Sequence, residues 1–308
     1  MQRGTAHRDR PSSDALSLAQ NGVGQFVIFV DDVDAVRLEL DHAGVTTISG
    51  PADRAWGMRT AWYLAGLLAV HSKRWIRHFP PATRCSVKLL LTSAGIKNAS
   101  IHAALVDLLG KPIAESDALC IPTAGYGHPQ GSPGGAWRFI AGKATTPMCE
   151  LGWRSLGVLE LTALPSIDRD RWVRWVRAAD VLLVNGGDAL YLSHWMRQSG
   201  LADLLPSLAE SVWVGLSAGS MVMTPRIGAD FVGWKPPNGD DSTLGIVDFS
   251  IFPHLDHELL PENTMADAEQ WAAEIARPAY AIDDDTAIKV TDGTVEIISE
   301  GHWKHFNG

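Results

Sequence analysis

The sequence is poor in cysteine, and it contains neither a long apolar run nor a block of basic residues. Its three cysteines, Cys85, Cys120 and Cys149, are an odd number without metal-type spacing. They argue against a disulfide framework and predict free thiols in a reducing compartment. No apolar run approaches the roughly 18 residues of a membrane-spanning helix. The N-terminal segment lacks the apolar centre of a secretory signal, so we expect a cytoplasmic protein.

Acidic residues outnumber basic ones. The sequence has 35 Asp and Glu but 26 Lys and Arg, which gives a formal net charge of −9. Binding to nucleic-acid phosphates needs a clustered cationic surface, so we expect no nucleic acid and no membrane among the partners. What the chain does have is apolar material, which makes up 46% of its 308 residues. This suffices for the core of one large domain or of two unequal ones.

Composition divides the chain into four parts. Residues 1–24 are polar and are predicted to form a disordered tail. Residues 25–72 indicate a small α+β segment, and residues 73–84, basic and aromatic with a Pro-Pro pair, indicate a linker. The remaining residues, 85–308, have the pattern of a larger domain.

In residues 85–308 short apolar strands alternate with helices. Strands are expected at 87–92, 117–124, 156–162, 181–184 and 212–216, and helices at 98–109, 166–179 and 188–199. This alternation predicts an α/β fold with a mainly parallel sheet covered on both faces. Asp292-Gly293, between two later strands, is a hairpin signal.

A serine between two glycines follows the apolar stretch 212–216, in Gly215-Leu216-Ser217-Ala218-Gly219. A nucleophilic serine projects from a sharp strand-to-helix turn, where neighbouring side chains would clash and glycines remove the clash. The helix that begins there directs backbone N–H groups toward a developing oxyanion. The motif also suits a plain tight turn of small residues, and we favour the nucleophile.

A second glycine-rich turn, Asn185-Gly186-Gly187-Asp188, follows the strand 181–184. Carboxyl ends of parallel strands share one edge of a sheet, so this turn is expected beside Ser217. There Gly187 would offer a second oxyanion N–H group. Asp188 would either contact substrate or cap the following helix.

A serine nucleophile needs a base, and eleven histidines are present. His254 ends the apolar strand in FSIFPHLDHE, where a catalytic residue on this edge belongs, and His257 and His194 are its competitors. An acid between Ser217 and His254 is expected to orient the imidazole. The candidates are Asp230, Asp240, Asp241 and Asp248.

The stretches LLVNGGDALYL, VGLSAGSMVM and FSIFPHL together resemble peptidase family S51, the aspartyl dipeptidase (peptidase E) group with its cyanophycinase relatives. The resemblance covers about 85–300 in motif order and spacing. It implies a class I glutamine amidotransferase-like three-layer sandwich. It also implies a serine peptidase that needs no metal and no other cofactor.

The resemblance extends to single residues. Those carried over from the family are the nucleophile Ser217, the base His254, and the oxyanion N–H groups of Gly187 and Ala218. Family members carry an aspartate shortly after the serine. Asp230, which lies 13 residues after Ser217, is our choice for the third member of the triad, ahead of Asp240 and Asp241.

The resemblance also suggests a substrate. Aspartyl dipeptidases act on short peptides with an N-terminal Asp, and selecting that carboxylate requires a cation or several N–H donors. Arg226 and Lys235 lie close to the serine turn in the sequence. Arg226 is the predicted substrate contact, together with Asp188, which replaces an asparagine frequent in the family. A small peptide is therefore the expected partner.

Residues 25–72 resemble half of a glyoxalase/bleomycin-resistance (vicinal oxygen chelate) module, one βαβββ unit, on VDDVDAVRLELDHAGVTTISGPADRAWGMRTAWYL. Ala69 stands near the metal-binding glutamate of that family, and the Asp-Pro-Asp-Gly turn is absent, so no metal is expected. His71 is interpreted as structural. A half module must pair with another half, which suggests a homodimer or the remnant of a fusion.

Other functions remain open. A cyanophycinase-like amide hydrolase is the nearest. An α/β-hydrolase esterase also uses Gly-x-Ser-x-Gly, but only 37 residues separate Ser217 from His254, and His302 or His305 would suit that fold better. A protein that binds a small molecule through residues 25–72 is the non-enzymatic alternative. Against it stands the complete set of nucleophile, base and oxyanion groups.

Overall fold

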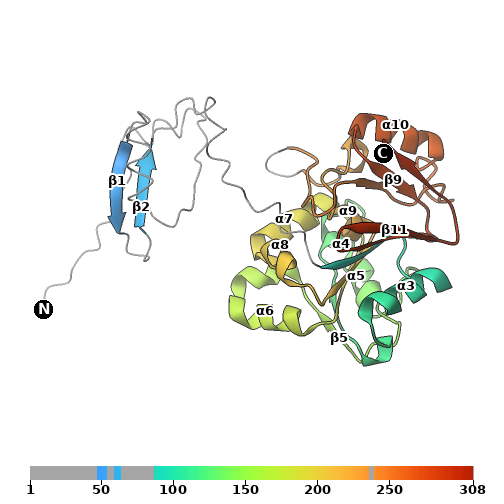
Figure 1. The fold of residues 1–308 in the computed structure, drawn as a ribbon, viewed down its shortest axis with the longest axis horizontal. Coiled ribbons are helices and arrows are strands. Elements are labelled where there is room, and N and C mark those ends of the chain that lie inside the picture. The colour runs from blue at the N-terminus through green and yellow to red at the C-terminus, as the bar shows by residue number, and fades with distance from the viewer. Residues whose placement is uncertain (1–46, 54–58, 64–86, 236–238, 308) are drawn as a thin grey trace, which may run out of the picture. The chain divides into compact units, whose positions relative to one another are not determined.

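The computed structural model describes residues 47–53, 59–63, 87–235 and 239–307. The chain divides into two compact units, residues 1–78 and 79–308. The larger unit holds every element from β3 to β12 (Figure 1).

In the first unit the described residues form two antiparallel strands, β1 (Thr47–Asp53) and β2 (Arg59–Tyr63). The register of this pair is irregular on both sides of Ser49. The remainder of the predicted βαβββ segment over 25–72 lies outside the described residues, as do Ala69, His71, the predicted tail 1–24 and the predicted linker 73–84.

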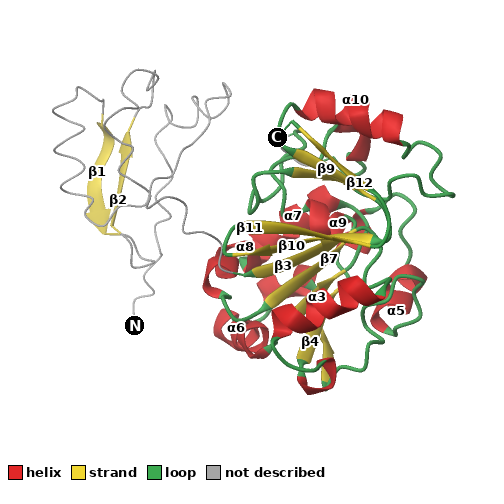
Figure 2. Cartoon of the chain, turned by 45° about the vertical axis from the view of Figure 1, so that its right-hand side comes forward, coloured by secondary structure: helices red, strands yellow, loops and turns green. Residues whose placement is uncertain are grey.

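The second unit is built on a seven-stranded sheet with the order β11-β10-β3-β7-β6-β4-β5 (Figure 2). From β3 to β5 the neighbours are parallel, and β10 and β11 add an antiparallel edge. The strands are β3 (Lys88–Thr92), β4 (Asp117–Ile121), β5 (Ser155–Val158), β6 (Val181–Val184), β7 (Val212–Leu216), β10 (Thr286–Thr291) and β11 (Thr294–Ser299).

Both faces of this sheet are buried, because alternate residues of each strand point to opposite sides. Leu89, Leu91 and Trp213 belong to the core on one face, with residues of α6 and α7, whereas Leu90 and Val214 belong to the core on the other, with residues of α3 and α5. Figure 2 shows helices on either side of the strands. The unit is therefore a three-layer sandwich.

The helices of the second unit connect the strands or cover the sheet. The α-helices are α3 (Ala99–Leu109), α4 (Ala124–Gly127), α5 (Pro133–Ile140), α6 (Arg169–Ala178), α7 (Ala189–Ser199), α8 (Leu201–Leu204), α9 (Ala218–Met221) and α10 (Met265–Ile275). The short 3-10 helices among its described residues are η1 (Ile113–Glu115), η2 (Leu161–Ser166), η3 (Leu205–Ser207) and η4 (Ala229–Phe231).

A smaller sheet has the order β12-β9-β8 and carries its own apolar cluster under α10. Its strands are β8 (Ser250–Phe252), β9 (Ala279–Ile282) and β12 (Trp303–Phe306). β8 and β9 are parallel, so the segments that follow their carboxyl ends lie side by side. Those segments are residues 253–264 and 283–285.

The structure confirms the α/β fold with its mainly parallel, doubly covered sheet, and the hairpin turn at Asp292-Gly293 between β10 and β11. Two predicted strands are shorter than expected. β4 ends before Pro122, whose ring nitrogen has no N–H to donate to a ladder. β5 ends at Val158, and a 3-10 helix follows in which the side chain of Glu160 accepts the N–H of Thr162.

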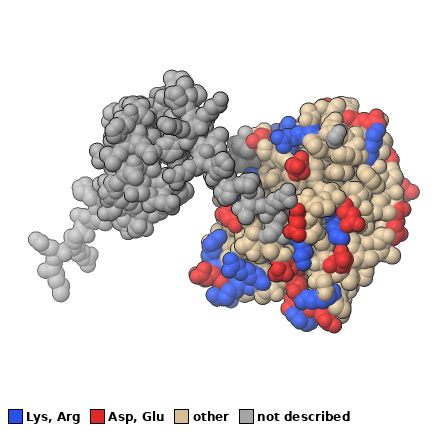
Figure 3. Space-filling model, viewed as in Figure 1, with Lys and Arg blue, Asp and Glu red and all other residues tan. Residues whose placement is uncertain are grey.

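The surface of the second unit carries charges of both signs. On the face drawn in Figure 3, scattered groups of Lys and Arg and of Asp and Glu side chains lie among larger areas of other residues. Within the described parts of the chain, no helix combines the length and the apolar character needed to cross a bilayer.

Candidate active site

The turn between β7 and α9 places Ser217 in a rare backbone conformation. Ser217 has φ 50° and ψ −111°, outside the regions that most non-glycine residues occupy. The surroundings hold this conformation, because the N–H of Ser217 donates to Thr92 O at 2.9 Å and Ser217 O accepts the N–H groups of Ser220 and Met221. The side chain is partly exposed at the carboxyl edge of the sheet, between the ends of β3 and β6. Such strain at a partly exposed hydroxyl is typical of a functional position.

The two glycines of the motif are required by close packing. A Cβ on Gly215 would collide with the carbonyl of Gly219, and a Cβ on Gly219 would collide with the carbonyl of Val184. The indole Nε1 of buried Trp213 donates to Gly219 O at 2.9 Å and fixes the far side of the turn. Glycine at both positions therefore lets α9 begin directly against the sheet.

The Gly186-Gly187 turn lies against the serine. A Cβ on Gly186 would be 3.4 Å from the Cβ of Ser217, so the two turns are in direct contact. Gly187 has φ +140°, and a Cβ there would collide with the backbone of Ala124. Among the described residues, neither the N–H of Gly187 nor that of Ala218 has a hydrogen-bond partner. Two backbone donors thus remain available beside Ser217.

His254 follows β8, and its ring is bonded to an aspartate that follows β9. His254 Nδ1 lies 2.7 Å from Asp284 Oδ1, and both side chains are about one fifth exposed. The N–H of His254 donates to Ser93 Oγ at 3.0 Å, which anchors a backbone with φ 57°. On the other side of Asp284, His257 Nε2 lies 3.6 Å from Oδ2. The parallel pairing of β8 and β9 brings these residues together.

The Asp284 carboxyl is held in its charged form. Burial favours the neutral acid, but the hydrogen bond with His254 and the positive charges of His254, His257 and Lys97 outweigh it, so the pKa of Asp284 lies below its ordinary value of 3.8. Asp284 therefore stays ionised at neutral pH, ready to orient and stabilise a charged imidazole.

The structure differs here from the sequence expectation, which sought the acid between Ser217 and His254. Asp230 is exposed in η4, and none of its contacts in the described structure involves His254. Asp241 accepts bonds from Arg226 Nε and the N–H of Gly228, and Asp240 caps the N–H of Ser242. Asp248 is exposed. The reason for the difference is topological, because the chain passes through α10 and β9 before it reaches the aspartate that is bonded to His254.

The two residues predicted to contact substrate have other partners. Asp188 is buried; its Oδ1 accepts the N–H of Tyr191 at 2.8 Å and caps α7, while Oδ2 accepts the N–H of Trp234 at 2.5 Å. This places Asp188 in the role of a helix cap that ties α7 to a loop. Arg226 is about half exposed and pairs with Asp241 through Nε at 2.9 Å.

Of the other candidate histidines, His257 lies beside Asp284, whereas His194 and His305 have aromatic neighbours. His194 is packed among the rings of Trp195 and Trp234, and His305 stacks on Tyr280. Cys120 and Cys149 are free and buried, whereas Cys85 lies outside the described residues. Among the described residues, no group of three or more His, Cys, Asp or Glu side chains is arranged to hold a metal ion.

Comparisons with known proteins show the family to which the chain belongs. The family model of Peptidase family S51 matches residues 89–298. Among solved structures, one of a protein assigned as a peptidase E from Listeria monocytogenes EGD-e is 19% identical, covers 70% of this chain and 99% of its own, and superposes with a TM-score of 0.51. A peptidase from an acI-B1 Actinobacterium is also 19% identical, covers 70% of this chain and 89% of its own, and has a TM-score of 0.46. No curated protein matches the chain.

At 19% identity the Listeria structure shows the fold alone, which is class I glutamine amidotransferase-like. The family match carries more, since it spans more than half of the chain, in a range that contains both glycine-rich turns, His254 and Asp284. The chain belongs to peptidase family S51 and is a serine-type peptidase.

Proposed function

We propose that the chain hydrolyses short peptides through an acyl-enzyme formed on Ser217, with His254 as the base and Asp284 as the acid of the triad. The observation that carries this proposal is the hydrogen bond of 2.7 Å between His254 Nδ1 and Asp284 Oδ1. This bond occupies Nδ1, so Nε2 is the ring nitrogen that accepts the proton of the Ser217 hydroxyl.

The reaction follows from these roles. Ser217 Oγ attacks the carbonyl carbon of the scissile bond while His254 takes the hydroxyl proton. The oxyanion that forms is held by the N–H groups of Gly187 and Ala218, which have no partner in the described part of the chain. His254 then gives its proton to the leaving amine. Water, deprotonated by His254, hydrolyses the ester on Ser217 and restores the enzyme.

Dipeptides with an N-terminal Asp are the substrates we propose. The family resemblance suggests this class, and Arg226 supports it in part. Its Nε is bonded to Asp241, and both terminal amino groups lack partners among the described residues. A guanidinium held in place at one nitrogen can still bind a carboxylate through the others.

The test is hydrolysis of a panel that contains Asp-X and Glu-X dipeptides, Ala-X dipeptides, amino-acid amides and β-aspartyl-Arg. We expect turnover of Asp-X above the other substrates, and a weaker preference for Asp-X in Arg226→Ala. Turnover of amides or β-aspartyl-Arg in place of Asp-X would show a different amide hydrolase on the same site. Folded protein that turns over none of these substrates would contradict the proposal.

A further inference from the structure

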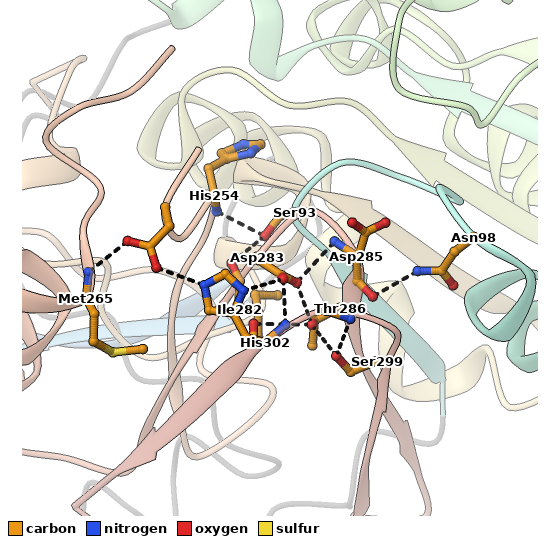
Figure 4. A network of polar contacts seen from close by, with 12 residues as sticks. Ser93, Asn98, His254, Met265, Ile282, Asp283, Asp285, Thr286, Ser299 and His302 are labelled. Atoms are coloured by element: carbon orange, nitrogen blue, oxygen red, sulfur yellow. Dashed lines mark hydrogen bonds and ion pairs between the residues drawn. The ribbon is translucent and has the colours of Figure 1, made fainter. Parts of the chain in front are cut away.

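His302 lies between two carboxylates that belong to different turns. Its Nε2 is 2.8 Å from Asp256 Oδ2, and its Nδ1 is 2.9 Å from Asp283 Oδ2 (Figure 4). The N–H of His302 also donates to Asp283 Oδ2, at 2.6 Å. Each ring nitrogen thus faces one carboxylate oxygen. A single side chain from the segment before β12 thus joins two loops.

These two loops carry the proposed base and acid. Asp256 is two residues after His254, in the segment that follows β8. Asp283 comes directly before Asp284, in the segment that follows β9. His302 therefore adds a side-chain link between the two turns that supply the His254–Asp284 hydrogen bond, beside the backbone bond from Leu255 N–H to Ile282 O. Its ring is about half exposed, but its partner Asp283 is 90% buried on its side chain.

Each turn is held rigidly around its aspartate. Asp256 has φ 53°, its N–H donates to Asn263 O at 2.7 Å, and its Oδ1 accepts the N–H of Met265. Asp283 Oδ1 accepts the hydroxyl of Thr286 at 2.6 Å and the N–H of Asp285 at 3.1 Å. With Oδ2 on His302, the Asp283 carboxylate is fully used within the network.

The neighbouring glycine shows how closely this segment approaches Asp283. A Cβ on Gly301 would collide with Oδ2 of that carboxylate, so only glycine lets His302 come this near. Both the backbone of residues 301–302 and the imidazole of His302 therefore lie close to the Asp283 carboxylate.

From this arrangement we infer that His302 is a positioning residue of the peptidase, which sets the His254–Asp284 hydrogen bond by clamping Asp256 to Asp283. The inference rests on the proposed function in one respect, the assignment of His254 and Asp284 to the triad. Without the clamp the N–H of Leu255 and the hydroxyl of Ser93 still donate to Ile282 O, so the two turns stay joined, but fewer links hold the separation between His254 and Asp284. Errors in such geometry lower kcat more than they raise KM.

Kinetics give the first test. His302→Ala should lower kcat by roughly 10- to 100-fold while KM changes by less than about twofold. His302→Gln keeps a donor near the position of Nε2 and should recover part of the loss, whereas Asp256→Asn should resemble His302→Ala. The double variant should lose no more than either single one, because both remove the same link. His102→Ala, an exposed histidine on α3, is the matched control.

A spectroscopic test is independent of turnover. The proton between His254 Nδ1 and Asp284 should give a low-field proton resonance that is absent from His254→Ala. We predict that this resonance moves or broadens away in His302→Ala and is unchanged in His102→Ala. An unchanged resonance together with unchanged kcat in His302→Ala would overturn the inference. Peptidase activity that survives in Ser217→Ala would instead overturn the proposed function. The low-field resonance would then still show whether His302 positions His254 and Asp284.

Discussion

Ser217 and His254 are fixed to two consecutive residues at the end of β3. The N–H of Ser217 donates to the carbonyl of Thr92, and the N–H of His254 donates to the hydroxyl of Ser93. Ser93 Oγ in turn donates to Ile282 O, two residues before Asp284. Both the serine and the histidine have positive φ, so neither turn adopts a relaxed conformation. One strand end thus sets the relative placement of all three proposed triad members.

Ser93→Ala is expected to damage this arrangement. The change removes a buried hydroxyl that accepts from His254 N and donates to Ile282 O. Leaving these groups unpaired should cost about 1–3 kcal/mol of unfolding free energy, and kcat should fall because His254 loses its anchor. Urea unfolding and steady-state kinetics measure the two effects. Ser116→Ala, a buried hydroxyl bonded to Pro112 O, is the control and should leave kcat unchanged.

Asp284→Asn and Asp230→Asn separate the observed acid from the one expected from the sequence. An amide at position 284 favours the wrong tautomer of His254 and cannot stabilise its charged form, so kcat should fall by about 10⁴-fold. Asp230 is exposed, and its replacement should change kcat by less than about twofold. Steady-state kinetics on both variants decide between them. The reverse order of effects would show that the acid is Asp230.

Gly187→Ala tests the second oxyanion donor. At φ +140° a Cβ would press on the backbone of Ala124, so the turn must shift and carry its N–H away from Ser217. Loss of one such donor lowers kcat by about 10²- to 10³-fold. Gly134→Ala, an exposed helical glycine with ordinary contact distances around its position, should have wild-type kcat. Equal kcat in both variants would exclude Gly187 from the oxyanion site.

The stability of the fold should depend on the charge of Asp284. Its pKa in the folded protein is below 3.8, so the folded state favours the carboxylate and gains stability at any pH above that value. This gain is lost as pH falls through the lowered folded pKa. The difference in unfolding free energy between wild type and Asp284→Asn should therefore be larger at pH 7 than near pH 3. Urea unfolding at both pH values measures it, and a difference that grows on acidification would contradict the account.

Sequence reasoning worked where the signal is local. Short apolar stretches predicted β3, β6 and β7 within a residue, and small residues around Ser217 and Gly187 indicated two tight turns at one sheet edge. These signals depend only on neighbours in the chain.

Sequence reasoning did not reach contacts that depend on pairing between distant strands. The search for the acid stopped at His254, although the apolar strand AYAI runs directly into Asp283-Asp284-Asp285. That signal is visible, but only the parallel pairing of β8 with β9 gives it meaning. For Asp188 the local pattern is enough to predict a helix cap, and its side chain caps α7. Its contact with substrate stays a prediction.

The central claim is that Ser217 is the nucleophile, and its most direct test is kcat/KM of Ser217→Ala on the best dipeptide of the panel. Ser211→Ala, a buried serine at the other end of β7, is the matched control. The account predicts a loss of at least about 10⁴-fold for Ser217→Ala, with wild-type stability, and little change for Ser211→Ala. Ser217→Ala protein that retains a tenth or more of wild-type kcat/KM would contradict it.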